Sequence, residues 1–135
     1  MADVNGLVRI LIIDDDWETT ELFKILLEPH QFEVVTSNSG QEGIKLAAEI
    51  EPDVIMIDLL MPEMNGLTVC DQVRKFSNVP ILMLTAISKP GTLSEALEHG
   101  ADDYLIKPVK SSVLTAHLKK LVRRERLNRQ ADQSR

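Results

Sequence analysis

Five short runs of apolar and β-branched residues recur along the 135-residue chain, and they constrain its fold more than any other feature. Each run has the length and composition of a buried β-strand. The runs begin 24, 22, 27 and 22 residues apart, which leaves room for one helix between consecutive strands. They are Val8–Ile13, Phe32–Thr36, Val54–Ile57, Ile81–Thr85 and Asp103–Ile106.

Amphipathic stretches of helical length separate these runs. In the first, one face at helical spacing carries Leu22, Phe23, Leu26 and Leu27. Strands that alternate with helices predict βαβ units. The expected fold is therefore α/β, a five-stranded, doubly wound parallel sheet with helices on both faces. The stretches are 17–27, 41–50, 65–76, one that starts near Pro90-Gly91 and one that starts near Ser111.

The fourth helix has a weak start. Pro90 suits a first helical turn, but Gly91 beside it lowers the helix propensity there. We therefore expect this helix to begin late or to be mobile.

Composition indicates a single domain with an aliphatic core, since 44% of the residues are hydrophobic and only 4% are aromatic. Cys70 is the single cysteine, which suits a reducing compartment, and we expect it to be a small core residue. Residues 1–7 lack the basic start and apolar run of a signal peptide, and no stretch approaches the roughly 20 apolar residues of a membrane span. The expected location is the cytoplasm.

Charge divides the chain into an acidic body and a basic tail. The net charge is −6, yet residues 119–135 hold seven basic and two acidic side chains, a net of +5, which leaves −11 for the rest. A body that acidic is not expected to bind nucleic acid by itself. The tail could do so, but a solvated helix end whose cations complement the helix dipole is favoured.

Side chains able to do chemistry follow four of the five runs. Ligands bind to doubly wound sheets at the carboxyl ends of the strands, so these side chains should converge on one edge. That edge would collect carboxylates, one hydroxyl and one ammonium group. The residues are Asp14, Asp15 and Asp16 after the first run, Asp58 after the third, Thr85 at the end of the fourth and Lys107 after the fifth.

At this edge the carboxylates of Asp14, Asp15 and Asp58 would lie within a few ångströms of one another. They would repel one another, which would raise the pKa of one of them. A divalent cation relieves the repulsion, and oxygen ligands without histidine or cysteine select Mg²⁺, with Mn²⁺ as the alternative. The same set suits phosphoryl transfer to a carboxylate, with Asp58 as nucleophile, Lys107 as a cation and Thr85 as a donor. Singly, each acid could be a helix cap and Lys107 a surface cation; together they favour a site.

Four motifs in this order and spacing resemble the receiver domain of two-component response regulators over residues 7–124. The resemblance implies a flavodoxin-like (βα)5 three-layer sandwich with strand order 2-1-3-4-5. It also leaves Lys107-Pro108 as a candidate cis peptide. The motifs are Ile-Leu-Ile-Ile-Asp-Asp-Asp at 10–16, Asp-Leu-Leu-Met-Pro-Glu-Met-Asn-Gly at 58–66, Ile-Leu-Met-Leu-Thr-Ala at 81–86 and Gly-Ala-Asp-Asp-Tyr-Leu-Ile-Lys-Pro at 100–108.

The resemblance also implies roles for the metal and phosphoryl ligands. Asp58 would be the phosphoacceptor, and Lys107 would pair with its carboxylate and then with the phosphoryl group. Asp15 would bind Mg²⁺ directly, Asp14 would bind it through water, and the backbone carbonyl of Leu60 would be a further ligand. Asp58 itself would complete the metal set.

Two further residues match the switch pair of the family, Thr85 and Tyr104. On phosphorylation the hydroxyl would move toward the phosphoryl group and the ring would turn inward. Asp16 receives no metal contact; we expect it to cap the helix that begins at Trp17. Leu60 and Ile87, each two residues past a site residue, cannot orient an attacking water, so we expect slow self-dephosphorylation.

The implied partners are a sensor histidine kinase or a phosphotransfer protein. The output surface would be built from the fourth helix, fifth strand and fifth helix, and a homodimer through it is one candidate assembly. Residues 125–135 would form a helical extension, either a linker to a C-terminal output domain or a frayed end.

Three alternatives use similar elements. A flavin-binding electron carrier would need a Ser/Thr/Gly-rich phosphate loop after the first strand, where this chain has three aspartates. An aspartyl-phosphate hydrolase would usually carry an acid at the position of Leu60. A degenerate receiver that acts only as a protein-binding module would have lost part of the site. All five residues are present, namely Asp14, Asp15, Asp58, Thr85 and Lys107.

Overall fold

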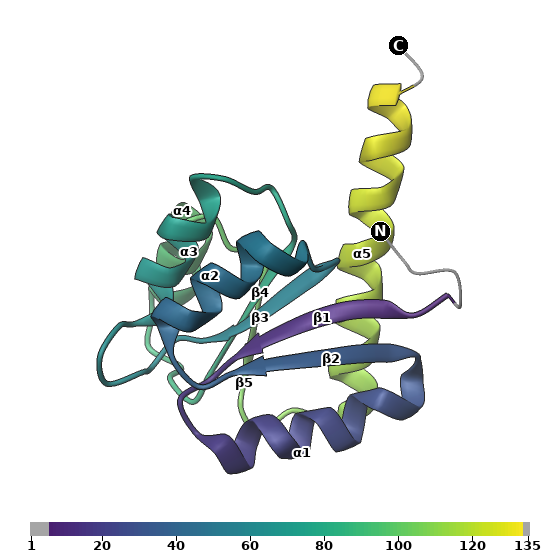
Figure 1. Ribbon diagram of the computed structural model, residues 1–135. Helices are drawn as coiled ribbons and strands as arrows, with labels where there is room; N and C mark the ends of the chain where they lie inside the picture. Colours follow the sequence, from purple (N-terminus) through teal and green to yellow (C-terminus); the bar gives the residue numbers. More distant parts are fainter. Residues whose placement is uncertain (1–5, 134–135) are drawn as a thin grey trace.

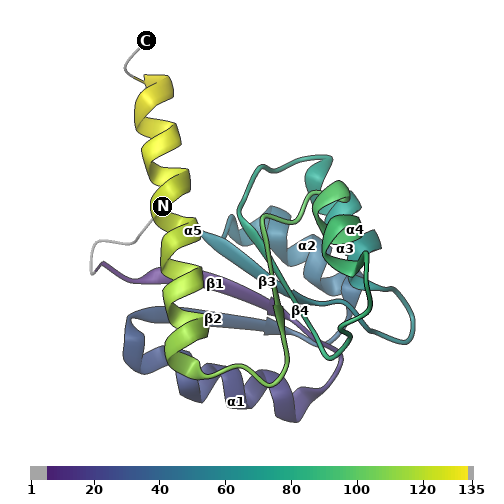
Figure 2. The same ribbon diagram turned by 180° about the vertical axis from the view of Figure 1, so that it is seen from behind.

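A five-stranded parallel sheet lies between two layers of helices in the computed structural model, which describes residues 6–133 (Figures 1 and 2). The order β2-β1-β3-β4-β5 confirms the predicted topology. In register, Ile10 of the first strand stands between Val34 and Val54. The strands are β1 (Val8–Ile13), β2 (Phe32–Ser37), β3 (Val54–Asp58), β4 (Ile81–Thr85) and β5 (Asp103–Ile106).

Helices cover both faces of this sheet, which is why its central strands are almost continuously aliphatic. On one face, Phe23 of α1 and Leu118 of α5 pack against the sheet. On the other, Val69 of α3 and Ala96 of α4 do so. The helices are α1 (Trp17–Leu27), α2 (Gly40–Ile50), α3 (Gly66–Arg74), α4 (Thr92–Glu98) and α5 (Ser111–Gln133), with a short 3₁₀ turn at Glu28–His30.

The helix faces agree with the sequence in most places but not at Leu22 or Phe76. The predicted helix over 65–76 ends at Arg74, and Phe76 is 47% exposed. Phe23 of α1 is buried, but Leu22 is 55% exposed, so the prediction of one shared buried face was wrong for that residue. The late start of the fourth helix is confirmed, since α4 begins at Thr92 after Gly91 adopts a left-handed conformation with φ of 86°. Cys70 is buried as expected, and burial raises the pKa of its thiol to about 11.

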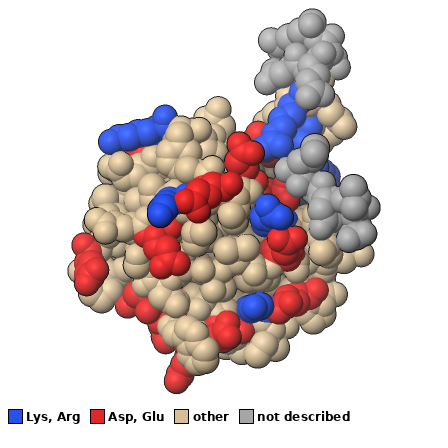
Figure 3. Space-filling model, in the orientation of Figure 1, with Lys and Arg blue, Asp and Glu red and all other residues tan. Residues whose placement is uncertain are grey.

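The last helix is longer than the sheet requires. Its last buried residue is Val122, and the remaining turns project away from the body (Figures 1 and 2). Lysine and arginine side chains gather on this projection, whereas acidic side chains are spread over the visible face of the body (Figure 3). No helix among residues 6–133 is both long and apolar enough to cross a membrane.

Candidate functional site

Three carboxylates meet at the carboxyl edge of the sheet, as the sequence predicts. Asp14 and Asp15 follow β1 directly, and Asp58 is the last residue of β3. Because β1 and β3 are neighbours in register, their ends lie side by side. One oxygen from each of the three carboxylates lies within 4.8 Å of the others, and Asp14 is buried while Asp15 is exposed.

Lys107 completes this cluster from the far side of β4. Its Nζ atom lies 3.2 Å from Asp14 Oδ2 and 3.7 Å from Asp58 Oδ2. It follows β5 directly, and the peptide bond from Lys107 to Pro108 is cis. The site thus combines one ammonium group with three carboxylates, so its net charge is negative when the acids are ionised.

The electrostatics of Asp58 follow from this balance. Burial raises the pKa of its carboxyl above the ordinary value, and the neighbouring Asp14 charge raises it further. Lys107 and the Leu60 N–H, which donates to Asp58 Oδ1 at 3.3 Å, lower the pKa, and Asp15 raises it again. The effects that raise the pKa are larger than those that lower it. The ionised Asp58 carboxyl is therefore destabilised, and a bound cation would offset this cost.

The donor set fits a hard divalent cation. All three side chains offer oxygen, and no histidine or cysteine takes part in this cluster of described residues. Two oxygens on one Mg²⁺ lie about 3–4 Å apart at bond lengths of about 2.0–2.1 Å. The 4.8 Å spread of the carboxylate oxygens is therefore close to what an ion would draw together.

The loop from Asp58 to Gly66 folds back onto the end of β3. The Gly66 N–H donates to the Leu59 carbonyl at 2.8 Å. A Cβ atom at position 66 would stand 2.7 Å from the Asp58 carbonyl oxygen, so only glycine allows this approach. The fold-back leaves Leu60 48% exposed beside the phosphoacceptor candidate.

Asp16 lies outside the carboxylate cluster and caps α1, as predicted. Its Oδ1 accepts a hydrogen bond from the Glu18 N–H at 3.1 Å, and its Oδ2 accepts one from the Thr19 hydroxyl at 2.8 Å. Its own N–H donates to Asp14 Oδ1 at 3.0 Å. The cap therefore also holds one oxygen of the buried acid.

The two switch candidates are connected through one residue. Thr85 is fully buried at the end of β4, and its Oγ1 accepts a hydrogen bond from the Ile87 N–H at 3.2 Å. The Tyr104 hydroxyl donates to the carbonyl of the same Ile87. Ile87, two residues after Thr85, thus links the end of β4 to the ring on β5.

Two residues that the sequence did not single out form hydrogen bonds with Asp14, one at the end of β2 and one in the loop after it. The Asp14 N–H donates to the Ser37 carbonyl at 3.1 Å, and Asn38 Nδ2 donates to the Asp14 carbonyl at 2.9 Å. In the sequence, Ser37 and Asn38 belong to a polar run that indicates only a turn. Their contact with the site is set by strand pairing across the sheet.

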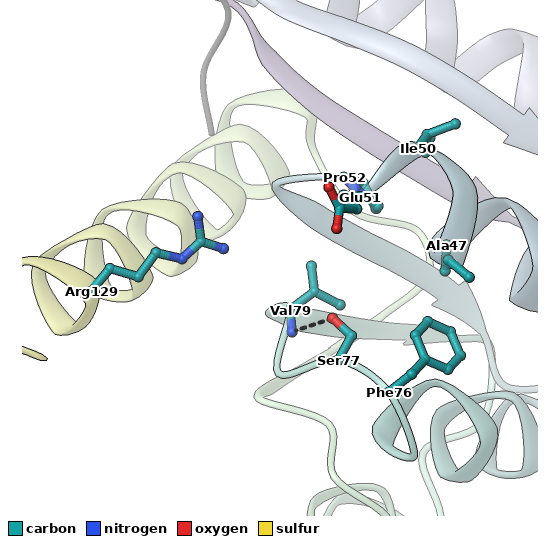
Figure 4. A pocket seen from close by; sticks show the side chains of 9 residues that line it. Ala47, Ile50, Glu51, Pro52, Phe76, Ser77, Val79 and Arg129 are labelled. Atoms are coloured by element: carbon teal, nitrogen blue, oxygen red, sulfur yellow. Dashed lines mark hydrogen bonds between the residues drawn. The ribbon is translucent and has the colours of Figure 1, made fainter.

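Two hollows lie near opposite edges of the sheet. One of about 220 Å³ adjoins Asp15 and Asn38, so solvent reaches the acids. Another of about 690 Å³ lies at the amino edge, where Arg129 reaches toward Glu51 and Phe76 (Figure 4). This larger hollow brings together no cluster of nucleophilic or metal-binding groups, so the chemistry belongs to the carboxyl edge.

The chain is similar to known proteins over most of its length. The family model described as the response regulator receiver domain matches residues 10–119. DNA-binding response regulator MtrA of Mycobacterium tuberculosis is 39% identical over 116 residues, covering 86% of this chain and 51% of its own. DNA-binding dual master transcriptional regulator RpaA of Synechocystis is 40% identical over 119 residues, covering 86% and 49%. The chain thus spans about half the length of these curated relatives.

Solved structures share the fold of the chain. A response regulator receiver domain protein from Clostridium thermocellum superposes with a TM-score of 0.85 at 30% identity, covering 90% of this chain and 98% of its own. The BeF3-activated receiver domain of Klebsiella pneumoniae RstA gives 0.81 at 30% identity, covering 85% and 98%.

Replacing Asp58 with asparagine should stabilise the metal-free protein at pH 7. The raised pKa means that the ionised carboxyl costs folding free energy above its unfolded pKa, and this cost fades as the pH falls and Asp58 is protonated. The melting temperature should therefore rise, by roughly 3–6 °C for each kcal/mol gained in a domain of this size. Thermal unfolding in EDTA followed by circular dichroism measures it at pH 7 and pH 4.

Asp16→Asn is the matched control, because it removes an acid beside the cluster but keeps a side chain that can cap α1. It should give no such rise. An Asp58→Asn protein that melts at or below the wild-type temperature at pH 7 would show that the ionised Asp58 carboxylate does not destabilise the fold.

Proposed function

Because the chain belongs to the response regulator receiver domain family, we propose that it accepts a phosphoryl group on Asp58 in a Mg²⁺-dependent reaction. The donor would be a sensor histidine kinase or a phosphotransfer protein. The observation that carries this proposal is the placement of Asp58 beside two further carboxylates and 3.7 Å from the Lys107 ammonium.

The chemistry follows from the groups around Asp58. Its carboxylate oxygen would form a bond to phosphorus while the bond from phosphorus to the donor nitrogen breaks. Lys107, already 3.7 Å away, would pair with the phosphoryl oxygens, and the Thr85 hydroxyl would donate to one of them. A bound Mg²⁺ would supply positive charge to the same oxygens.

The proposed metal ligands are the carboxylates of Asp15 and Asp58, the backbone carbonyl of Leu60 and, through water, Asp14. This assignment suits the burial, since Asp15 is exposed to entering ions while Asp14 is already engaged by Lys107 at 3.2 Å. Mn²⁺ would be an acceptable substitute because it favours the same oxygen ligands.

Output would pass through Thr85 and Tyr104. If Thr85 turns toward a phosphoryl group, it gives up its bond to the Ile87 N–H, and Ile87 is also what holds the Tyr104 hydroxyl. Movement there would bias a two-state equilibrium of the surface made by α4, β5 and α5. That surface exposes large apolar side chains, which suits a docking partner or a second copy: Leu93, Leu97, Ile106 and Val113.

Residues 7–124 would form the receiver, and residues 125–135 a helical linker to a C-terminal output domain, of which 134–135 lie outside the described residues. Relatives named as DNA-binding regulators are about twice as long, so DNA contact would belong to such a domain and not to this acidic body. The proposed location is the cytoplasm, where a sensor histidine kinase would phosphorylate it. The degenerate receiver is not favoured, because all five site residues are present.

Incubation with Mg²⁺ and acetyl phosphate or phosphoramidate should add about 80 Da to the intact mass, one phosphoryl group. EDTA and Asp58→Asn should each abolish the gain, since one removes the metal and the other the nucleophile. Asp16→Asn, which leaves the cluster intact, should retain it. No gain with either donor, together with no change in Trp17 fluorescence on adding Mg²⁺, would contradict the proposal.

The phosphorylated protein should lose its phosphoryl group slowly, and Leu60→Asn should speed the loss several-fold. Leu60 is exposed beside Asp58, and its apolar side chain cannot orient an attacking water, whereas an amide can. The decay of the added mass after removal of the donor measures the rate. Leu60→Met is the control, because it keeps the size and polarity. An unchanged rate in Leu60→Asn would count against this explanation.

A further inference from the structure

Asn38 joins the loop after β2 to the acids after β1. Its Nδ2 atom donates to the Asp14 carbonyl oxygen at 2.9 Å and to Thr20 Oγ1 at 3.1 Å. Thr20 is fully buried in the first turns of α1, and its hydroxyl donates in turn to the Trp17 carbonyl at 2.9 Å. One amide group thus holds both the end of the β1 segment and the start of α1.

Both backbone groups of Asp14, its N–H and its carbonyl, are therefore hydrogen-bonded. Its N–H donates to the Ser37 carbonyl at 3.1 Å, and its carbonyl receives the Asn38 amide. The turn that presents Asn38 is itself fixed, because the Ser37 hydroxyl donates to the Ser39 carbonyl at 2.9 Å. Both peptide planes around Asp14 are set by this neighbouring segment.

The peptide plane between Asp14 and Asp15 is the more important of the two for binding a cation. The Asp14 carbonyl belongs to the peptide bond that joins Asp14 to Asp15, so its orientation fixes how the two side chains diverge. Asp14 has side-chain anchors of its own, the Asp16 N–H at 3.0 Å and Lys107 at 3.2 Å. Within residues 6–133, no hydrogen bond or ion pair holds the Asp15 carboxylate, so its direction depends on the backbone.

We propose that Asn38 is a positioning residue for the metal site, one that holds the Asp14–Asp15 peptide so that the Asp15 carboxylate points at the ion. This inference rests on the proposed Mg²⁺-dependent function. Asn38 touches neither the ion nor the phosphoryl group and acts through the backbone it holds.

The side chain of Asn38 suits this role. Its amide offers two N–H donors on one atom, which lets it hold a carbonyl and a hydroxyl together. It is also exposed, so water can replace it as a donor to the carbonyl without fixing the peptide in one orientation. Loss of Asn38 should therefore affect the geometry of the site more than the stability of the fold.

Asn38→Ala should weaken Mg²⁺ binding by roughly threefold to tenfold, the range expected from the net value of one hydrogen bond. Half-saturation of Trp17 fluorescence in a Mg²⁺ titration measures this. Ca²⁺ titration is the second probe, because Ca²⁺ tolerates irregular geometry whereas Mg²⁺ demands a near-ideal octahedron. A positioning role predicts that Ca²⁺ affinity falls less than Mg²⁺ affinity.

Ser39→Ala is the matched control. Ser39 is the next residue and caps α2 through the Glu42 N–H at 3.1 Å, so its loss costs stability without releasing Asp14. Its Mg²⁺ affinity should equal that of the wild type.

The remaining outcomes would each reject either the positioning role of Asn38 or the proposed function. If Asn38→Ala binds Mg²⁺ as the wild type does, the inference fails while the proposed function stands. If it loses Mg²⁺ and Ca²⁺ affinity equally, or if Ser39→Ala loses as much, the role of Asn38 is merely structural and the inference fails. If the wild type itself gives no response to Mg²⁺, the proposed function fails first.

Discussion

Mutual repulsion among three carboxylates at one edge of the sheet governs how the site is built. The strand order places the ends of β1 and β3 side by side, and the burial of both strands fixes the backbone from which the acids project. Lys107 offsets only part of the charge, and burial adds to the cost at Asp58. A local conflict of this kind, maintained within an otherwise consistent fold, is typical of a functional site.

The two ends of β5 are held in different ways. At its start, Asp102 Oδ2 accepts hydrogen bonds from Arg74 Nη2 and from the Ile81 N–H, both at 2.9 Å, and Arg124 reaches Asp102 Oδ1 at 3.2 Å. Just past its end, the Lys107 N–H donates to the Thr85 carbonyl at 2.8 Å, and the Lys107 ammonium lies 3.2 Å from Asp14 Oδ2. Tyr104 lies between these two anchors, and its hydroxyl donates to the Ile87 carbonyl. This position suits a ring that transmits a change from the acids to the outer face of the strand.

Sequence alone was sufficient for the strands and for most of the site, for a physical reason. Strands buried on both faces must be aliphatic throughout, and chemistry at a parallel sheet must follow the strands, so Asp58 and Lys107 could be placed without coordinates. Periodicity could not tell that Leu22 faces solvent, because α1 carries apolar residues on more than one face. Asn38 could not be found either, since its partner Asp14 is 24 residues away and its local sequence indicates only a turn.

The proposed role of these acids is to hold a divalent cation beside Asp58. Anomalous diffraction from a crystal containing Mn²⁺ tests this role, because the metal signal locates the ion without reference to any expected ligand. We expect a peak about 2.1 Å from an oxygen of Asp15, an oxygen of Asp58 and the Leu60 carbonyl. A saturating Mn²⁺ concentration that leaves this edge empty, or an ion bound only to acids elsewhere on the surface, would contradict it.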